Sequence, residues 1–354
     1  MRNLFIVLVG LVGFTTLAIP VAFSQSDRMT DWTRLPPIPD KLGVAGPFSG
    51  EHNGVLLLAG GANFPDKMPW DGGTKIWHDR VYALSDPTSS WIEAGKLPRP
   101  LGYGVSITTP NGIVCVGGSD LQRHYADCFR LLWENQRLTL TELPSLPKPV
   151  ANMCGAALGN TLYIAGGIET PTSTLAMHSF YCIDLSAPQS QWRELETWPG
   201  PERMLAVAAV QEGAFFLMSG VSLTPDNLGK PVRKYLTDAY TYKPESGWRR
   251  IANLPRPAVA APTPAMAHGS NGILVIGGDD GANVGFQPPE RHPGFPTSIL
   301  RYQSKRDEWS VWHQAPLGQV TTTIVPWGNS LVIPSGEVRP GVRTPEVWAY
   351  RPKE

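Results

Sequence analysis

Short apolar runs that end in a pair of small residues recur along the whole chain. Each run has four or five apolar residues, as at residues 55–59 and 113–116. The six closing pairs are Gly60-Gly61, Gly117-Gly118, Gly166-Gly167, Ser219-Gly220, Gly277-Gly278 and Ser335-Gly336. Successive pairs lie 57, 49, 53, 58 and 58 residues apart. Runs this short favour buried strands, and a recurring spacing in this range indicates a repeat architecture.

The residues around each run predict four strands per repeat. Turn-forming dipeptides such as Asn53-Gly54 precede the runs and favour hairpins. A strand-forming segment with aromatic residues follows, for example at residues 80–84, and a segment from a Trp to a Leu-Pro ends the repeat, as at residues 91–98. The double glycine and the closing Trp resemble the kelch motif of β-propellers. We therefore predict an all-β fold, a six-bladed kelch-type β-propeller over residues 25–354.

The two ends of the chain complete one repeat between them. The last repeat has a third strand at residues 346–350, but the chain reaches Glu354 before a fourth can form. The segment Trp-Thr-Arg-Leu-Pro at residues 32–36 matches the missing outer strand. We predict that this N-terminal strand closes the last blade, which leaves no exposed blade edge.

The first residues have the pattern of a targeting segment. Arg2 is followed by an apolar run over residues 4–22 and by the small residues Ala22 and Ser24. This pattern predicts a signal peptide at residues 1–24 and export to the periplasm or beyond. A retained membrane anchor is the alternative, since the run nearly reaches the length that spans a bilayer. No second long apolar run follows, so we expect no stable membrane insertion after cleavage.

Composition narrows the classes of protein that remain. Gly 36 and Pro 35 disfavour a helical bundle, while 42% hydrophobic residues exclude a disordered chain. The formal net charge is zero, which gives no support for a nucleic-acid partner. The four cysteines, in no CxxC or Cys/His cluster, are interpreted as buried free thiols, with no metal site expected. The sequence leaves the oligomeric state open, and a homodimer is possible.

One loop carries the most distinctive chemistry. Long irregular segments follow several glycine pairs, at residues 62–75 and 279–296, and are expected on one face of the propeller, where such loops commonly carry function. In the last repeat, Glu337 follows the small pair directly and Arg343 comes after a Pro-Gly turn that folds the loop back. These two side chains are expected to share one opening. From the residue types alone, a salt bridge that pins a surface loop is the simpler interpretation.

Four segments together resemble one family. Residues 335–344 are similar to a Gly-Glu-x-x-Pro-Gly-x-Arg-Thr signature of the bacterial N-acetylneuraminate epimerase family, the sialic acid mutarotases, which are kelch propellers. Residues 39–50, 59–64 and 102–106 resemble further stretches of the same family. In its better-known members the signature lies before those three stretches, and here it comes last. The difference resembles a circular permutation by whole blades, which a closed ring with neighbouring termini tolerates.

The resemblance implies an isomerase for a small sugar acid. Such an enzyme accelerates interconversion of the α- and β-anomers of N-acetylneuraminate by general acid/base ring opening. Glu337 matches the family's catalytic carboxylate and would accept a proton, while Arg343 would hold the substrate carboxylate or stabilise developing charge. No metal or redox cofactor is needed for this chemistry.

Three further residues are expected to line the mouth as substrate-binding groups: Tyr103, Asn152 and Arg203. Tyr103 lies in a stretch that resembles the family, whereas the other two are chosen by position alone. A role as a structural strut between blades is the alternative for each. The Ser-x-Asp-x-Gly-x-x-Trp boxes of sialidases and the ligand cluster of galactose-oxidase-like copper enzymes are absent from the sequence. The remaining alternatives are another acidic or amino sugar as substrate, or a non-catalytic carbohydrate- or protein-binding kelch propeller.

Overall fold

The computed structural model describes residues 31–187 and 189–352. The predicted signal peptide, residues 1–24, lies outside the described residues. Within those ranges the regular structure consists of β-strands and two short 3-10 helices, η1 (Pro69–Asp71) and η2 (Pro289–Arg291). No helix in this part of the chain is long and apolar enough to cross a membrane.

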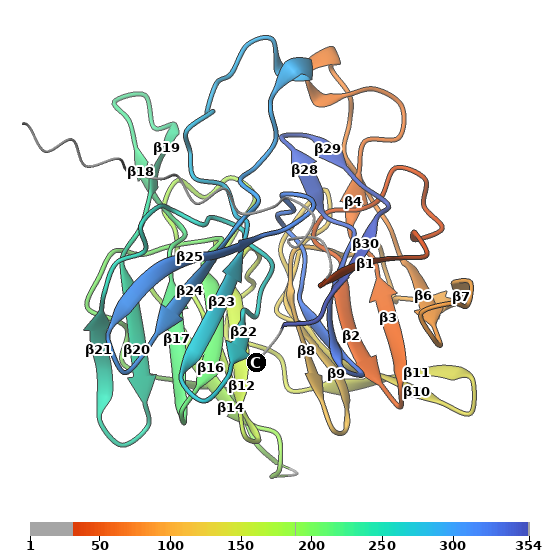
Figure 1. The fold of residues 1–354 in the computed structure, drawn as a ribbon, viewed down its shortest axis with the longest axis horizontal. Helices are drawn as coiled ribbons and strands as arrows, with labels where there is room; N and C mark the ends of the chain where they lie inside the picture. The colour runs from red at the N-terminus through yellow and green to blue at the C-terminus, as the bar shows by residue number, and fades with distance from the viewer. Residues whose placement is uncertain (1–30, 188, 353–354) are drawn as a thin grey trace, which may run out of the picture.

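Six four-stranded antiparallel sheets form the blades of a propeller (Figure 1). Blade 1 contains β2 (Phe48–His52), β3 (Val55–Ala59), β6 (Arg80–Leu84) and β7 (Ile92–Lys96), and blade 2 contains β8 (Val105–Thr109), β9 (Gly112–Val116), β10 (Cys128–Glu134) and β11 (Arg137–Leu143). Blade 3 contains β12 (Cys154–Leu158), β13 (Thr161–Ala165), β14 (Phe180–Asp184) and β15 (Arg193–Glu194), and blade 4 contains β16 (Val207–Gln211), β17 (Ala214–Met218), β20 (Ala239–Lys243) and β21 (Gly247–Ile251). Blade 5 contains β22 (Met266–His268), β23 (Gly272–Ile276), β24 (Ser298–Gln303) and β25 (Glu308–Gln314), and blade 6 contains β26 (Val325–Trp327), β27 (Ser330–Pro334), β30 (Val347–Tyr350) and β1 (Trp32–Leu35). The predicted six-bladed propeller is confirmed.

The N-terminal strand completes the last blade, as predicted. β1 pairs antiparallel with β30, with Trp32 opposite Tyr350 and Leu35 opposite Val347. The rings of Trp32 and Tyr350 stack with centroids 4.6 Å apart. An exposed ion pair from Arg34 Nη2 to Glu346 Oε1, at 2.6 Å, crosses the same two strands. The outer edge of blade 6 is therefore formed by the start of the chain.

The uninterrupted apolar runs form the second strand of each blade, which is covered on both faces. In β3, Leu56 and Leu58 belong to a buried cluster with Val325 of blade 6, while Leu57 belongs to a cluster with Ile113 of blade 2. Successive side chains of a strand point to opposite faces. A strand between two neighbouring blades therefore needs apolar residues at every position, which explains why the runs do not alternate.

A closed ring of backbone hydrogen bonds joins the inner ends of the six blades. Each blade contributes one residue with a left-handed φ of 51° to 65°: Gly46, Tyr103, Asn152, Leu205, Ala260 and Thr321. From Tyr103 onward, each N–H donates to the carbonyl of the residue before it over 2.7–2.9 Å, and Gly46 N–H closes the ring on Thr321 C=O at 2.6 Å. Non-glycine residues rarely adopt this region. The ring offsets that cost and locks the propeller independently of the β1–β30 pairing.

The first residue of each pair has a left-handed φ; it is serine in blades 4 and 6 and glycine elsewhere, and at Gly60 and Gly166 it lies against the backbone of the next blade entry. A Cβ at Gly60 would be 2.1 Å from the carbonyl oxygen of Leu101, and one at Gly166 would be 2.2 Å from that of Arg203. Both glycines also have φ near 65°, which disfavours other residues. The spacing that defines the repeat is thus set by a close approach of backbones.

Candidate functional site

The connections between second and third strands gather at one end of the propeller, called the mouth below (top of Figure 1). Three of them contain a two-stranded ribbon: β4 (Ala62–Asn63) with β5 (Ile76–Trp77), β18 (Val221–Pro225) with β19 (Pro231–Tyr235), and β28 (Glu337–Arg339) with β29 (Val342–Arg343). The connection in blade 5 contains η2, and that in blade 1 also contains η1. The long loops noted in the sequence therefore lie on one face.

Glu337 and Arg343 face each other across the β28–β29 ribbon, where they are paired in register. Arg343 Nη2 lies 3.6 Å from Glu337 Oε2, and the side chains are 4% and 16% exposed respectively. Glu337 Oε1 accepts a hydrogen bond of 2.7 Å from the N–H of Gly341, in the predicted Pro-Gly turn. The turn therefore fixes one carboxylate oxygen and leaves the other beside the guanidinium.

The guanidinium of Arg343 has unused hydrogen-bonding capacity. Its Nε donates to the carbonyl of Ala62 at 3.3 Å, and its Nη2 lies 3.4 Å from the hydroxyl of Tyr103. The ring of Phe64 packs over it, 4.7 Å from centroid to Cζ. Nη1 is buried and has no hydrogen-bond partner among the described residues. A buried donor without an acceptor is costly in a folded protein and indicates that a ligand or water satisfies it.

The ribbon that carries the pair is held from both sides. Arg339 Nη1 donates to the carbonyl of Glu290, in η2, at 2.7 Å. On the other side Gly341 packs against Pro69 of η1, where an added Cβ would be 2.5 Å from Cγ. The loops of blades 1 and 5 therefore support the ribbon, so the pair is positioned by three parts of the chain.

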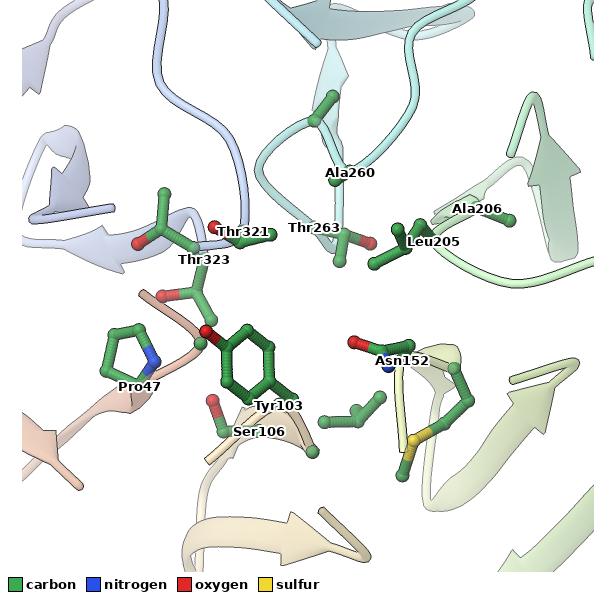
Figure 2. Close-up of a pocket in the computed structure, with 16 residues that line it drawn as sticks. Pro47, Tyr103, Ser106, Asn152, Leu205, Ala206, Ala260, Thr263, Thr321 and Thr323 are labelled. Atoms are coloured by element: carbon green, nitrogen blue, oxygen red, sulfur yellow. The ribbon is translucent and has the colours of Figure 1, made fainter. Parts of the chain in front are cut away.

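Tyr103 and Asn152 line the inner end of the channel (Figure 2). Figure 2 shows the ring of Tyr103 in the middle of this opening, with Asn152, Thr263 and Thr321 around it. The cavity has a volume of about 50 Å³, enough for a few water molecules but not for a sugar. The hydroxyl of Tyr103 lies 3.4 Å from Arg343 Nη2, so this side chain connects the channel to the ribbon. Tyr103 is brought to the Glu337–Arg343 pair, and Asn152 lines only the channel below.

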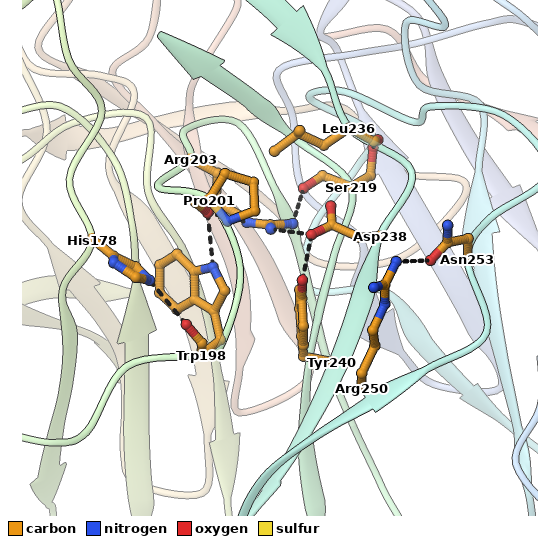
Figure 3. Close-up of polar contacts among 10 residues, drawn as sticks. All are labelled: His178, Trp198, Pro201, Arg203, Ser219, Leu236, Asp238, Tyr240, Arg250 and Asn253. Atoms are coloured by element: carbon orange, nitrogen blue, oxygen red, sulfur yellow. Dashed lines mark hydrogen bonds and ion pairs between the residues drawn. The ribbon is translucent and has the colours of Figure 1, made fainter. Parts of the chain in front are cut away.

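Arg203 occupies a different position from the one expected of a substrate-binding group (Figure 3). Its side chain is 0% exposed, and Nη2 donates to Asp238 Oδ2 at 2.7 Å. Nη1 donates to the carbonyl of Ser219 at 2.9 Å and Nε to that of Pro201 at 3.3 Å. The structure thus places Arg203 as a strut, because its guanidinium has neither free surface nor a free nitrogen.

Two residues of the blade 1 loop, unnamed in the sequence analysis, complete the surroundings of Tyr103. Trp77 meets the Tyr103 ring edge-on, with centroids 6.1 Å apart. Lys75 Nζ lies 4.9 Å from the centroid of Tyr103 and 5.1 Å from that of Trp77. The only sequence signal for these residues is that a cation and an aromatic residue occur together in a long loop.

A chain of polar groups supports the base of the same loop. Asn63 Nδ2 donates to Asp40 Oδ1 and to the carbonyl of Gly43, at 3.2 and 2.9 Å, so its Oδ1 remains as the acceptor for His78 Nε2 at 2.9 Å. Burial lowers the pKa of His78 despite the nearby charge of Asp40. His78 is therefore neutral near pH 7, with the proton on Nε2.

A buried apolar cluster joins the loops of blades 3 to 6. Its members are Ile168, Ala176, Met204, Val221, Leu223, Val259, Ala260 and Val320. Polar groups lie beside it, since the hydroxyl of Tyr235 donates to Asp279 Oδ2 at 2.8 Å and Val320 pairs with Glu337. The cluster therefore packs these loops together. The part of the mouth formed by blades 6, 1 and 2, with Glu337, Arg343 and Lys75, is called its charged side below.

Comparisons with known proteins point to one family. A family model described as N-acetylneuraminate epimerase matches residues 12–140 and 143–286, a range that does not include the Glu337–Arg343 ribbon. The N-acetylneuraminate epimerase of Haemophilus influenzae (strain PittEE) is 27% identical over 229 residues, 57% of each chain, and that of Yersinia pestis is 47% identical over 85 residues, 22% of this chain and 21% of the relative. The chain thus matches little more than half the length of the first of these relatives.

A solved structure entitled "Structure of YjhT" has the same fold. It superposes with a TM-score of 0.66 over 90% of this chain and 97% of its own, at 14% sequence identity. At that identity the similarity concerns the fold alone.

Proposed function

This chain belongs to the N-acetylneuraminate epimerase family, and on that premise we propose that it accelerates the interconversion of the α- and β-anomers of N-acetylneuraminate. The observation that carries the proposal is the Glu337–Arg343 pair, a carboxylate and an under-satisfied guanidinium at the mouth. A carboxylate that can accept a proton and a cation that can bind the substrate carboxylate are groups with which a protein can accelerate anomerisation of a sugar acid. The family model does not match the ribbon itself. The assignment of these two residues therefore depends on their similarity to the family's signature.

Anomerisation proceeds by opening and reclosing of the sugar ring. A base removes the proton of the anomeric hydroxyl while an acid protonates the ring oxygen, and the pyranose then recloses on the other face. We assign the base to Glu337, because Gly341 fixes Oε1 and Oε2 remains on the side of Arg343. One positioned base typically contributes about 10²–10⁴-fold. The pyranose ring already opens without a catalyst in water, so a rate contribution of this size is enough for an enzyme of this kind.

Arg343 is assigned to the carboxylate of the substrate. The substrate carboxylate is attached to the anomeric carbon, so the two carboxylates come close and their repulsion must be neutralised. A guanidinium between them does this and supplies directional N–H donors. The hydroxyl of Tyr103, 3.4 Å from Nη2, is placed to contact the same substrate group.

The test is an anomerisation assay on freshly released α-N-acetylneuraminate, followed by proton NMR. We expect the native protein to accelerate α-to-β exchange and Glu337→Gln to lose about 10²–10⁴-fold of that acceleration. The thermal midpoint of the variant serves as the folding control. Full activity in Glu337→Gln would remove this residue from the mechanism. Tight binding without any acceleration by the native protein would instead favour a non-catalytic carbohydrate-binding propeller.

Export remains part of the proposal. Arg2, the apolar run over residues 4–22 and the small residues after it support cleavage near Ser24 and a periplasmic or secreted location. The mass and the N-terminal sequence of the protein recovered from the periplasmic fraction test this. A full-length chain retained in the membrane fraction would favour the anchor.

A further inference from the structure

Lys75 is a cation without a counter-ion at the charged side of the mouth. It is partly buried, and its Nζ lies about equally far from the ring centroids of Tyr103 and Trp77, at 4.9 and 5.1 Å. No carboxylate lies within 4 Å of it among the described residues. Two aromatic faces hold the ammonium in place and neutralise none of its charge. A partly buried lysine that is held in place but has no ion-pair partner gains little for folding, so we expect its charge to serve a ligand.

The charged side chains in contact with Tyr103 or Arg343 do not balance. Among them Glu337 contributes one negative charge, while Arg343 and Lys75 contribute two positive charges, and both cations contact the same tyrosine. Two donors in this cluster, Arg343 Nη1 and Trp77 Nε1, also lack a hydrogen-bond partner among the described residues. One surplus positive charge and two unused donors are complementary to a ligand with one negative charge and several acceptor oxygens.

The two cations differ in access. Arg343 Nη1 is shielded from solvent, so a carboxylate reaches it only after a covering side chain has moved. Lys75 is only partly buried, so its ammonium can meet a ligand before Arg343 Nη1 does. The two residues are therefore suited to successive contacts with one anion.

We propose that Lys75 selects sugars that carry a carboxylate, by pairing with that carboxylate as the sugar enters and binds. This inference rests on the proposed function and adds to it a specificity-determining residue in the blade 1 loop. Lys75 contacts Tyr103 and forms no ion pair with the Glu337 base, so we expect it to act on binding. Its removal should raise KM and leave kcat nearly unchanged.

The experiment compares two substrates and four proteins. The substrates are N-acetylneuraminate and its methyl ester, which has no negative charge. The proteins are the native chain, Lys75→Met, Lys75→Arg, and Lys67→Met as a matched control, since Lys67 is an exposed lysine of the same loop. We expect Lys75→Met to raise KM for the acid about 10-fold, as for loss of one charge-assisted hydrogen bond, and to leave KM for the ester unchanged. Lys75→Arg should restore most of the affinity, and Lys67→Met should change neither substrate.

Other outcomes separate this inference from the proposed function. Equal losses for acid and ester, or no loss in Lys75→Met, would overturn the role of Lys75 while leaving the isomerase intact. If the native protein accelerates neither substrate, the proposed function fails, and the binding of N-acetylneuraminate by calorimetry still tests Lys75. In that case, a dissociation constant that is the same for native protein and Lys75→Met would overturn charge recognition as well.

Discussion

Two arginine–carboxylate pairs in this propeller have the same chemical groups and differ in how many of the arginine N–H donors have an acceptor. In blade 4, every nitrogen of the Arg203 guanidinium has an acceptor, and the contact to Asp238 Oδ2 is 2.7 Å (Figure 3). The rings of Trp198 and Tyr240 also pack near the guanidinium, with their centroids 5.5 and 5.4 Å from Arg203 Cζ. At the mouth, the Arg343–Glu337 contact is 3.6 Å and one guanidinium nitrogen has no partner among the described residues.

The difference separates a structural pair from a candidate functional one. A buried arginine needs an acceptor for each of its remaining donors, and the carbonyls of Pro201 and Ser219 serve Arg203 in this way, while Asp238 Oδ1 is buried without a hydrogen-bond partner among the described residues. Burial alone would raise the pKa of Asp238, but the hydrogen bond and charge of Arg203, together with the hydrogen bond of Tyr240, outweigh it and hold that pKa below its ordinary value. Arg343 keeps a spare donor, which favours a ligand.

Removing each arginine should have opposite effects on stability and activity. Arg203→Met leaves Asp238 buried without its counter-ion, and we expect a loss of about 3–5 kcal/mol in the free energy of unfolding. Arg343→Met should cost less, about 1–2 kcal/mol, because its contact to Glu337 is long at 3.6 Å, its Nη1 is already without a partner, and Glu337 keeps its bond to Gly341. Anomer exchange should be lost in Arg343→Met alone. Urea denaturation and the NMR exchange assay measure the two effects.

The same pair of variants can contradict the comparison. If Arg203→Met does not fold, Asp238→Asn replaces it, since it removes the charge and keeps the shape. Equal stability losses at the two sites would show that the unpaired Nη1 of Arg343 does not mark a functional difference.

The pH dependence of stability should reveal the blade 4 pair. Because the pKa of Asp238 is lower in the folded than in the unfolded chain, where it is about 3.9, its contribution is present above that pH. It is lost as the pH falls through the folded value. We expect native protein to be more stable than Asp238→Asn at pH 7 and the difference to shrink as the pH falls below about 3.9, measured from urea midpoints. A stability difference between the two proteins that does not change as the pH falls would show that Asp238 is not the group whose lowered pKa stabilises the fold.

The repeat, the blade closure and the ribbon pair were predictable because each depends on local signals. The glycine pairs mark close backbone approaches, and the Pro-Gly turn after Glu337 brings Arg343 opposite it. Arg203 lies buried against Asp238, in the role of a structural strut that the sequence analysis gave as the alternative. Tyr103 and Asn152 occupy the hydrogen-bonded ring, and the equivalent ring residue in blade 4 is Leu205, two residues further on.

The surroundings of Tyr103 were not predictable in the same way. Blades 4 and 6 have a ribbon in the matching loop, but the blade 1 loop that holds Lys75 and Trp77 differs from both in length and sequence, so the repeat gives no register for their side chains. Their positions depend on contacts with Tyr103 of the next blade, 26 to 28 residues along the chain. The fold follows from the repeat, whereas the site depends on the residues that break it.

The smallest predicted effects come from two tyrosine hydroxyls, one at each pair. Tyr240 OH donates to Asp238 Oδ2 at 2.6 Å in a buried position, so Tyr240→Phe should lower the free energy of unfolding by about 1–1.5 kcal/mol without slowing anomer exchange. Tyr103 OH lies 3.4 Å from Arg343 Nη2, a long contact that contributes little to folding. Tyr103→Phe should therefore change stability by less than about 0.5 kcal/mol and slow exchange several-fold, because the substrate loses one polar contact. Both variants remove a single oxygen atom, so differences in packing are small. If Tyr240→Phe slowed exchange and Tyr103→Phe unfolded the protein, the roles of the two pairs would have to be reversed.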